Sequence, residues 1–262
     1  MRFLKWMIGL GVMAALAVGA GLGLAFFTSA PPTTFYTNTA LVPFDANVNP
    51  QPTGDASAEL TPIPLPATVS LPVPFTSQAP LNDWSAKQHT CEEATLVMVD
   101  MYFKGKRDGA LIDPNTANEA INLVSTWKPV QDMRYAQYGE MARSYLSYGY
   151  QILDATRINI KTELALGRPV IVGVRTHGLG NPHYPGFYSH HEETGWSVSH
   201  YIDVVGYDQN DTVILNDPGI SAGHGYHITF DQLFFAISDL DQAYPNLNDG
   251  QKILVLAPIA GA

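Results

Sequence analysis

The feature that most restricts what this chain can fold into is a long uncharged stretch near its N-terminus. Residues 6–27 contain no charged side chain and directly follow Arg2 and Lys5. As a helix rising ~1.5 Å per residue, this stretch would be roughly 33 Å long, which matches the hydrocarbon core of a bilayer. No other Lys or Arg occurs before Lys87. Because positive charge favours the cytoplasmic side, the sequence predicts a cytoplasmic N-terminus at 1–5, a transmembrane signal-anchor helix at 6–27, and the remainder outside the cytoplasm.

A cleaved signal peptide is the alternative interpretation of the same stretch. The small residues of Thr28-Ser29-Ala30 form an acceptable cleavage site, and cleavage would produce a secreted protein. Pro31 directly after this site disfavours cleavage, and the uncharged run is longer than the usual core of a signal peptide. We therefore expect an uncleaved anchor and a location at the cell membrane.

Residues 28–70 have the composition of a linker. They are rich in Pro, Thr, Ala and Asn, contain no Lys or Arg, and lack the apolar period of a helix or a strand. A segment of this kind cannot bury enough apolar surface to become ordered. The sequence therefore predicts a disordered linker at 28–70 that tethers one folded domain, residues 71–262, near the membrane.

Composition argues against several classes of protein. The formal net charge of −10 disfavours nucleic acid as a partner, because binding phosphates requires a basic surface. Cys91 is the single cysteine, so the chain can form no internal disulfide and has no zinc-type cysteine pair. His190, His191 and Glu192 are potential metal ligands, but neighbouring histidines on an extended chain point in opposite directions. We expect neither a metal nor a cofactor.

In the folded domain, most of the predicted helices precede the predicted strands. Three capping boxes indicate helix starts, and they are Thr90-x-x-Glu93, Thr116-x-x-Glu119 and Thr229-x-x-Gln232. Helices are expected near 91–103, 117–127, 138–148, 159–166 and 230–238. Strands are expected at 170–174, 200–207, 212–217 and 252–257. This order favours an α+β fold with an antiparallel sheet over alternating βαβ units.

Cys91 lies at a position that favours thiol chemistry. If Thr90 caps the helix, Cys91 is the first helical residue, and the free N–H groups and positive dipole there would lower the pKa of its thiol. Glu92 and Glu93 oppose this effect, although we expect their side chains to diverge from the sulfur. The alternative is a structural role, because Cys91 also falls on an apolar helical stripe with Ala94.

His200 and Asp217 lie at the two ends of a predicted hairpin whose turn is at 208–211. The ends of a hairpin return to each other, and a carboxylate beside an imidazole orients the ring and supports its charged form. Asp203 is the alternative partner, expected to point along the same face as His200 but to align less well. Each of these residues can also be structural. A joint role with Cys91 requires the fold to bring them together.

Three motifs, in this order, indicate a family. They are Val73-Pro74-Phe75-Thr76-Ser77-Gln78, then Cys91-Glu92-Glu93-Ala94, then His200-Tyr201-Ile202-Asp203-Val204-Val205-Gly206-Tyr207 with Asn216-Asp217-Pro218. From Val73 to its C-terminus the chain resembles the papain-like cysteine peptidases of the bacteriocin-processing, double-glycine-leader type, and particularly their stand-alone relatives. The resemblance implies a papain-like fold in which the nucleophile begins a central helix packed on an antiparallel sheet.

The resemblance also implies roles for individual residues. Cys91 is the nucleophile, His200 is the general base and later the acid, and Asp217 orients His200. Gln78 matches the glutamine whose side-chain amide helps to form the oxyanion hole. It lies thirteen positions before the cysteine, a longer gap than is usual in the family, and Gln88 is the alternative. The substrate implied is a peptide or a protein.

The sequence thus predicts a membrane-tethered, extracytoplasmic cysteine peptidase that works through a Cys-His-Asp triad and an acyl-enzyme. One alternative is a transglutaminase-like enzyme of the cell envelope that uses the same triad for acyl transfer. Another is a non-catalytic surface module that binds peptides. The loop at 175–199, which leads directly into His200, is expected to form one wall of the substrate cleft.

Overall fold

The structure, a computed structural model, describes residues 41, 43–44, 65–130, 132–179, 198–247 and 249–260. The predicted transmembrane helix at 6–27 and most of the predicted linker lie outside these residues. Within the described part of the chain, no helix has the length and apolar character needed to cross a membrane.

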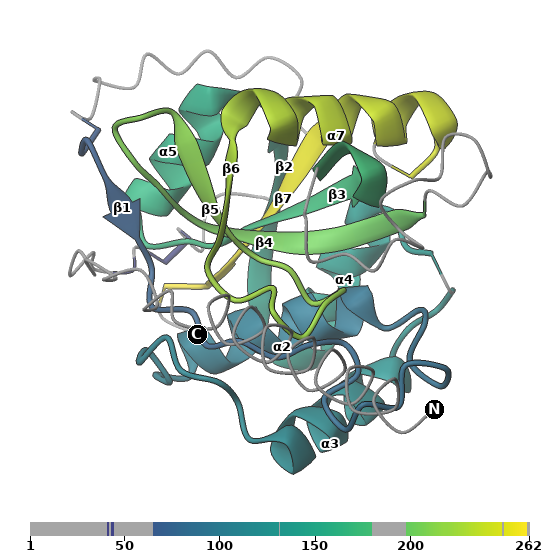
Figure 1. Ribbon diagram of the computed structural model, residues 1–262. Coiled ribbons are helices and arrows are strands. Elements are labelled where there is room, and N and C mark those ends of the chain that lie inside the picture. The colour runs from purple at the N-terminus through teal and green to yellow at the C-terminus, as the bar shows by residue number, and fades with distance from the viewer. Residues whose placement is uncertain are drawn as a thin grey trace, which may run out of the picture. The chain divides into compact units, whose positions relative to one another are not determined.

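An antiparallel sheet forms the centre of the domain, with strands paired in the order β2-β7-β3-β4-β5-β6 (Figure 1). The short strand β1 pairs with β4 outside this order. The strands are β1 Val69–Ser70, β2 Tyr148–Asp154, β3 Val170–Arg175, β4 Ser199–Tyr207, β5 Thr212–Asn216, β6 Tyr226–Thr229 and β7 Lys252–Pro258. Strands β3 and β7 are continuous apolar runs because nearly every residue in them is buried.

Helices cover both faces of the sheet. Figure 1 shows α2, α3 and α4 on one side and α5 and α7 on the other. The helices are α2 Cys91–Phe103, α3 Pro114–Ser125, α4 Tyr135–Leu146, α5 Arg157–Ala165 and α7 Phe230–Ala243, with a short 3₁₀ helix at Thr176–Leu179. Helix α2 is the central one, since every residue from 91 to 99 is buried. The predicted α+β class with an antiparallel sheet is confirmed.

Most of the predicted elements lie within two residues of their expected bounds. Helix α2 begins and ends as predicted, and α7 starts at the predicted capping box, where the Gln232 N–H donates to the Thr229 hydroxyl at 3.1 Å. The helix predicted at 138–148 is wrong at both ends. Helix α4 starts at Tyr135 and ends before Ser147, whose φ of 60° is left-handed and terminates the helix. Strands β2 and β6 were not predicted.

The other two predicted capping boxes are wrong. Helix α3 begins three residues earlier than expected, because the Asp113 carboxylate accepts the Thr116 N–H at 2.9 Å and Pro114 occupies the first helical position. At α2 the Thr90 hydroxyl donates to the backbone carbonyls of Gln78 and Lys87, both at 3.1 Å, instead of capping the helix.

The folded part of the chain extends further toward the N-terminus than the predicted boundary at residue 71. Val69 and Ser70 form β1 and pair with β4. Phe44 forms a bridge with Ile259, is only 7% exposed, and has the Arg168 guanidinium 4.4 Å from its ring centre. These residues within the predicted linker are ordered because the sheet edge and the core offer them hydrogen bonds and apolar contacts.

Candidate active site

A pocket of about 350 Å³ lies where the start of α2, the start of β4 and the turn after β5 meet. Gln78, Cys91 and His200 all line it, although they are far apart in the sequence. Described residues at both ends of the loop 175–199 line it as well, and residues 180–197 of that loop lie outside the described part. The fold therefore brings three of the four predicted site residues to one cavity.

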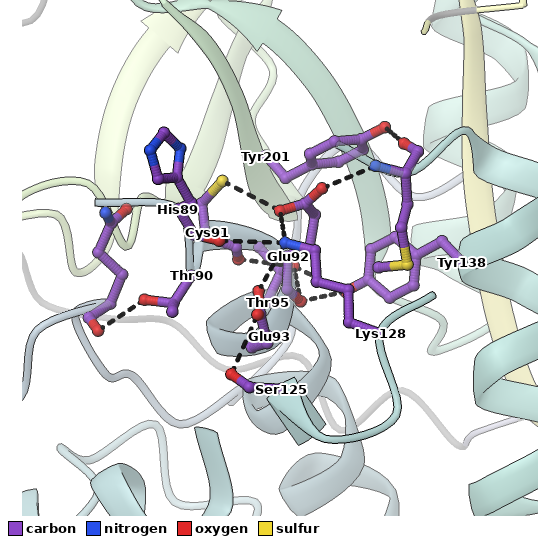
Figure 2. Close-up of polar contacts among 12 residues, drawn as sticks. His89, Thr90, Cys91, Glu92, Glu93, Thr95, Ser125, Lys128, Tyr138 and Tyr201 are labelled. Atoms are coloured by element: carbon purple, nitrogen blue, oxygen red, sulfur yellow. Dashed lines mark hydrogen bonds and ion pairs between the residues drawn. The ribbon is translucent and has the colours of Figure 1, made fainter. Parts of the chain in front are cut away.

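Cys91 is the first residue of α2 and is 8% exposed. Its Sγ donates a hydrogen bond to Oε2 of Glu92 at 3.7 Å, and the two side chains point toward each other in Figure 2. The backbone N–H of Tyr201, the residue after His200, is near enough to the same sulfur to lower its pKa in part. The start of α2 and the start of β4 are thus in direct contact at the thiol.

Two expectations about this thiol are wrong. Burial is the largest effect on the Cys91 pKa, and the Glu92 carboxylate adds to it, so the pKa is raised well above its ordinary value. The hydrogen bond from Tyr201 and the positive charge of Lys128 only partly oppose this rise. The Glu92 side chain does not diverge from the sulfur, because Lys128 and the backbone of Met133 hold its carboxylate beside it. Burial and the Glu92 carboxylate therefore both favour the neutral thiol over the thiolate.

His200 and Asp217 are joined by a hydrogen bond between Nε2 and Oδ1 at 2.8 Å. His200 is 4% exposed and Asp217 is fully buried, and the Gly219 N–H donates to the same Oδ1 at 2.9 Å. A carboxylate acceptor keeps the ring hydrogen on Nε2, which leaves Nδ1 as the basic nitrogen. The register pairs Asp203 with Asn216, so Asp217 follows the paired end of β5 and is not opposite His200.

Asp203 is not the partner of His200. It is three residues further along β4, and because side chains alternate along a strand it points to the opposite face, which corrects the expectation that the two share a face. Asp203 is fully buried, and within the described part of the chain neither of its carboxyl oxygens has a hydrogen-bond partner. Burial raises the pKa of this carboxyl well above its usual value.

Gln78 is held in the pocket wall by bonds at both its backbone and its side chain. Its backbone N–H donates to Pro218 O at 2.8 Å, and its side-chain Nε2 donates to Lys87 O at 2.7 Å. The second hydrogen of Nε2 remains for another acceptor. Gln88 also lines the pocket but is exposed. Gln78 is the more firmly positioned of the two candidates.

Sequence reasoning missed Lys128. Its Nζ bonds Glu92 Oε2 at 2.8 Å and Glu93 Oε2 at 3.2 Å, and it also donates to His89 O at 3.0 Å. Two adjacent glutamates at the start of a buried helix require a cation nearby. That requirement is readable from the sequence, but the identity of the lysine depends on the path of the chain after α3.

No cluster of three or more potential metal ligands occurs among the residues that the structure describes. His190, His191 and Glu192, the ligands considered from the sequence, lie outside them.

Comparisons with known proteins match one family model and several solved structures. The model of the Peptidase_C39 like family matches residues 70–250. A solved structure described as a C39-like peptidase from Bacillus anthracis is 17% identical, with a TM-score of 0.44, covering 71% of this chain and 94% of that one. Xylellain, a cysteine protease from Xylella fastidiosa, is 10% identical, with a TM-score of 0.41, covering 84% and 95%. The curated proteins contain no match.

Replacing Asp203 with Asn should change how stability depends on pH. The folded-state pKa of Asp203 is raised above its unfolded value, so its protonated form stabilises the fold at low pH, and this contribution is lost as pH rises above about 4. Between about pH 4 and the raised folded-state pKa, the free energy of unfolding of the native chain should fall by about 1.4 kcal/mol per pH unit relative to that of the Asp203→Asn variant. Thermal melts of both proteins at several pH values measure this. Glu119→Gln, at an exposed carboxylate, is the control, and parallel curves for native and Asp203→Asn would contradict the expectation.

Proposed function

This chain belongs to the Peptidase_C39 like family of cysteine peptidases, and we propose that it hydrolyses peptide bonds outside the cytoplasm while tethered to the membrane by residues 6–27. The observation that carries the proposal is the arrangement around the pocket. Cys91 and His200 line one cavity, and Asp217 is bonded to the far nitrogen of the His200 ring at 2.8 Å. This arrangement supplies a nucleophile, a base and a group that orients the base.

The first step is attack by the Cys91 sulfur on the carbonyl carbon of the scissile amide. Because the surroundings of Cys91 favour the neutral thiol, its proton must leave as the bond forms. Nδ1 of His200 takes that proton and the ring becomes an imidazolium. The buried Asp217 carboxylate stabilises that positive charge through the Nε2 hydrogen bond.

The carbonyl oxygen becomes negatively charged in this step and needs hydrogen-bond donors. The backbone N–H of Cys91 is one, since the first N–H groups of a helix have no partner within the helix. The side-chain amide of Gln78 is the other, with one hydrogen on Lys87 O and one directed to the substrate. Each well-placed donor contributes about 3 kcal/mol to lowering the barrier.

The tetrahedral intermediate collapses when the C–N bond breaks and His200 gives its proton to the leaving amine. The product is a thioester between Cys91 and the acyl part of the substrate. His200, now neutral, takes a proton from water as the water oxygen attacks the thioester carbonyl. The C–S bond then breaks, His200 returns its proton to the sulfur, and the acyl part of the substrate leaves as a free carboxylic acid.

The location outside the cytoplasm is supported by the sequence of the N-terminus. Arg2 and Lys5 precede the uncharged stretch at 6–27, and no further basic residue occurs before Lys87. The composition of residues 28–70, rich in Pro, Thr, Ala and Asn, supports a linker between the anchor and the peptidase domain. A single free cysteine is uncommon outside the cytoplasm unless its chemistry is used.

Three substitutions test the proposed triad. Cys91→Ala should abolish hydrolysis of a fluorescent protein substrate and labelling by a thiol-directed epoxide inhibitor. His200→Ala should lower the hydrolysis rate about 10²–10⁴-fold because the general base is lost. Asp217→Asn should lower it less, through misorientation of the ring. The matched control is His89→Ala, at a histidine that lines the same pocket and should keep most of the activity. Hydrolysis that survives Cys91→Ala would refute the assignment.

Gly219→Ala tests whether the position of the imidazole matters. A Cβ at residue 219 would lie 2.8 Å from His200 Nε2 and 3.2 Å from Asp217 Oδ1, so the bonded pair would have to separate. We expect a loss of about 10–100-fold in kcat with the fold retained, because a shift of about 1 Å costs this much. Ser221→Ala, an exposed residue in the same turn, is the control. Equal kcat values for Gly219→Ala and the control would contradict this.

The anchor is tested by fractionation of cells that express the full chain. The full chain should stay with the membranes after carbonate extraction, and a chain that lacks residues 2–27 should not. Protease added to intact spheroplasts should digest the domain if it lies outside the cytoplasm. Recovery of the full chain in the soluble fraction, or its protection from the protease, would contradict the proposed location.

A further inference from the structure

A buried cluster of charged side chains lies against the Cys91 sulfur and takes no part in the steps above (Figure 2). It consists of Glu92, Glu93 and Lys128. Lys128 bonds both carboxylates, at 2.8 and 3.2 Å, and the side chains of the three residues are 3%, 3% and 7% exposed. Charges this deeply buried interact strongly, because little water screens them.

The two glutamates have different partners beyond the shared lysine. Glu92 accepts the Met133 N–H on Oε1 at 3.1 Å and faces the sulfur with Oε2 at 3.7 Å. Glu93 accepts the Ser125 hydroxyl on Oε1 at 3.1 Å. The contact with the sulfur therefore belongs to Glu92 alone. With all three groups ionised, the cluster carries one net negative charge beside the nucleophile.

We propose that Glu92 holds Cys91 as a neutral thiol in the resting site, and that Lys128 limits this effect, so that the pair sets how readily the sulfur gives up its proton. The proposal rests on the proposed function, because it concerns the nucleophile of that reaction. Glu92 acts on the reacting atom directly. Lys128 is a positioning residue that acts through Glu92.

The contacts account for the opposite effects of Glu92 and Lys128 on the thiol. The thiol donates its hydrogen to Glu92, so a thiolate would lose this bond and face a carboxylate at close range. Glu92 is one of the causes that raise the pKa of Cys91, and Lys128 is one of those that lower it. Burial alone would lower the Lys128 pKa, but the two glutamates outweigh burial and raise it, so the lysine stays charged.

Other ionisable groups surround the cluster and belong to several elements. Within the described residues, Tyr138 comes from α4, Tyr201 and His200 come from β4, and His89 and Asp132 line the pocket nearby. The tyrosines that contact the cluster remain neutral, since burial raises their pKa well above its usual value. Among the described residues, the charged side chains that contact one another beside the thiol are therefore Glu92, Glu93 and Lys128.

A neutral resting thiol has a chemical benefit outside the cytoplasm. Oxidants react with the thiolate, so a single cysteine held as a thiol is protected from oxidation and from mixed disulfides. The sulfur becomes reactive when its hydrogen turns from Glu92 toward His200 and Nδ1 takes it. The hydrogen bond from the resting thiol to Glu92 must therefore break before the proton can pass to His200.

The test is the rate of alkylation of Cys91 by iodoacetamide as a function of pH. Glu92→Gln removes the charge but keeps the amide oxygen for Met133 and the size of the side chain. It should move the pH midpoint of alkylation down and raise the rate at pH 7 about threefold or more, since a tenfold larger thiolate fraction outweighs the lower nucleophilicity. A slower rate would identify Glu92 as a base for the thiol, and an unchanged rate would show no influence; either overturns the proposal.

Glu93→Gln is the matched control. It removes the same charge from the same lysine at the same depth, one residue further along α2, without touching the sulfur. The proposal expects a clearly smaller shift than for Glu92→Gln. Equal shifts would mean that net charge alone acts on the thiol, and would overturn the role of the Glu92 contact.

Lys128→Met should move the midpoint in the opposite direction, up, and slow alkylation at pH 7. A residue that only stabilised the fold would give changes of one sign in all three variants. Circular dichroism and thermal melts report whether Lys128→Met folds, and if it does not, the comparison of Glu92→Gln with Glu93→Gln decides.

Alkylation needs no peptide substrate, so this result is separate from the test of the proposed function. If the opposed shifts occur but the chain hydrolyses no peptide, the control of the thiol stands and the peptidase assignment fails. If hydrolysis depends on Cys91 but Glu92→Gln leaves alkylation unchanged, the peptidase assignment stands and this inference fails.

Discussion

The contact between the first residue of α2 and the start of β4 is the interaction on which the site depends. The Tyr201 N–H lies near the Cys91 sulfur and lowers its pKa in part, and the Tyr201 hydroxyl donates to Met133 O at 2.6 Å. The Tyr201 ring also packs edge-on against Tyr138, with ring centres 5.9 Å apart. One tyrosine thus connects the nucleophile helix, the strand that carries His200 and the segment that leads into α4.

Backbone bonds fix the remaining site groups relative to this contact. The N–H of Gln78 donates to Pro218 O at 2.8 Å, directly after Asp217, and the Thr90 hydroxyl donates to Gln78 O at 3.1 Å. The same threonine was expected to cap α2, and it instead connects the start of the helix to the segment that carries Gln78. The site is therefore held by the ends of secondary elements and by the turns between them, while the sheet and α2 provide a rigid support.

Elements set by contacts between residues close in the sequence could be predicted, and features set by contacts between distant residues could not. Local signals, such as the apolar run after Cys91 and the capping box at Thr229, predicted α2 and the start of α7. Strand β2 was not predicted, because its pairing partner β7 lies about a hundred residues later. The face of Asp203 was misjudged, although strand alternation gives it. Asp203 lies three positions after His200 on the same strand, and an odd offset puts the two side chains on opposite faces. The contact between Glu92 and Lys128 depends on the chain path after α3, which no local pattern encodes.

The reaction proposed for this site requires the Cys91 thiol to pass its proton to His200. The alkylation rate of Cys91 at pH 7 in the native chain and in His200→Ala tests this most directly, because the reaction needs the base but no substrate. We expect Cys91 in His200→Ala to be alkylated at least about tenfold more slowly than in the native chain, while circular dichroism shows the same fold. Equal rates in the two proteins would contradict it.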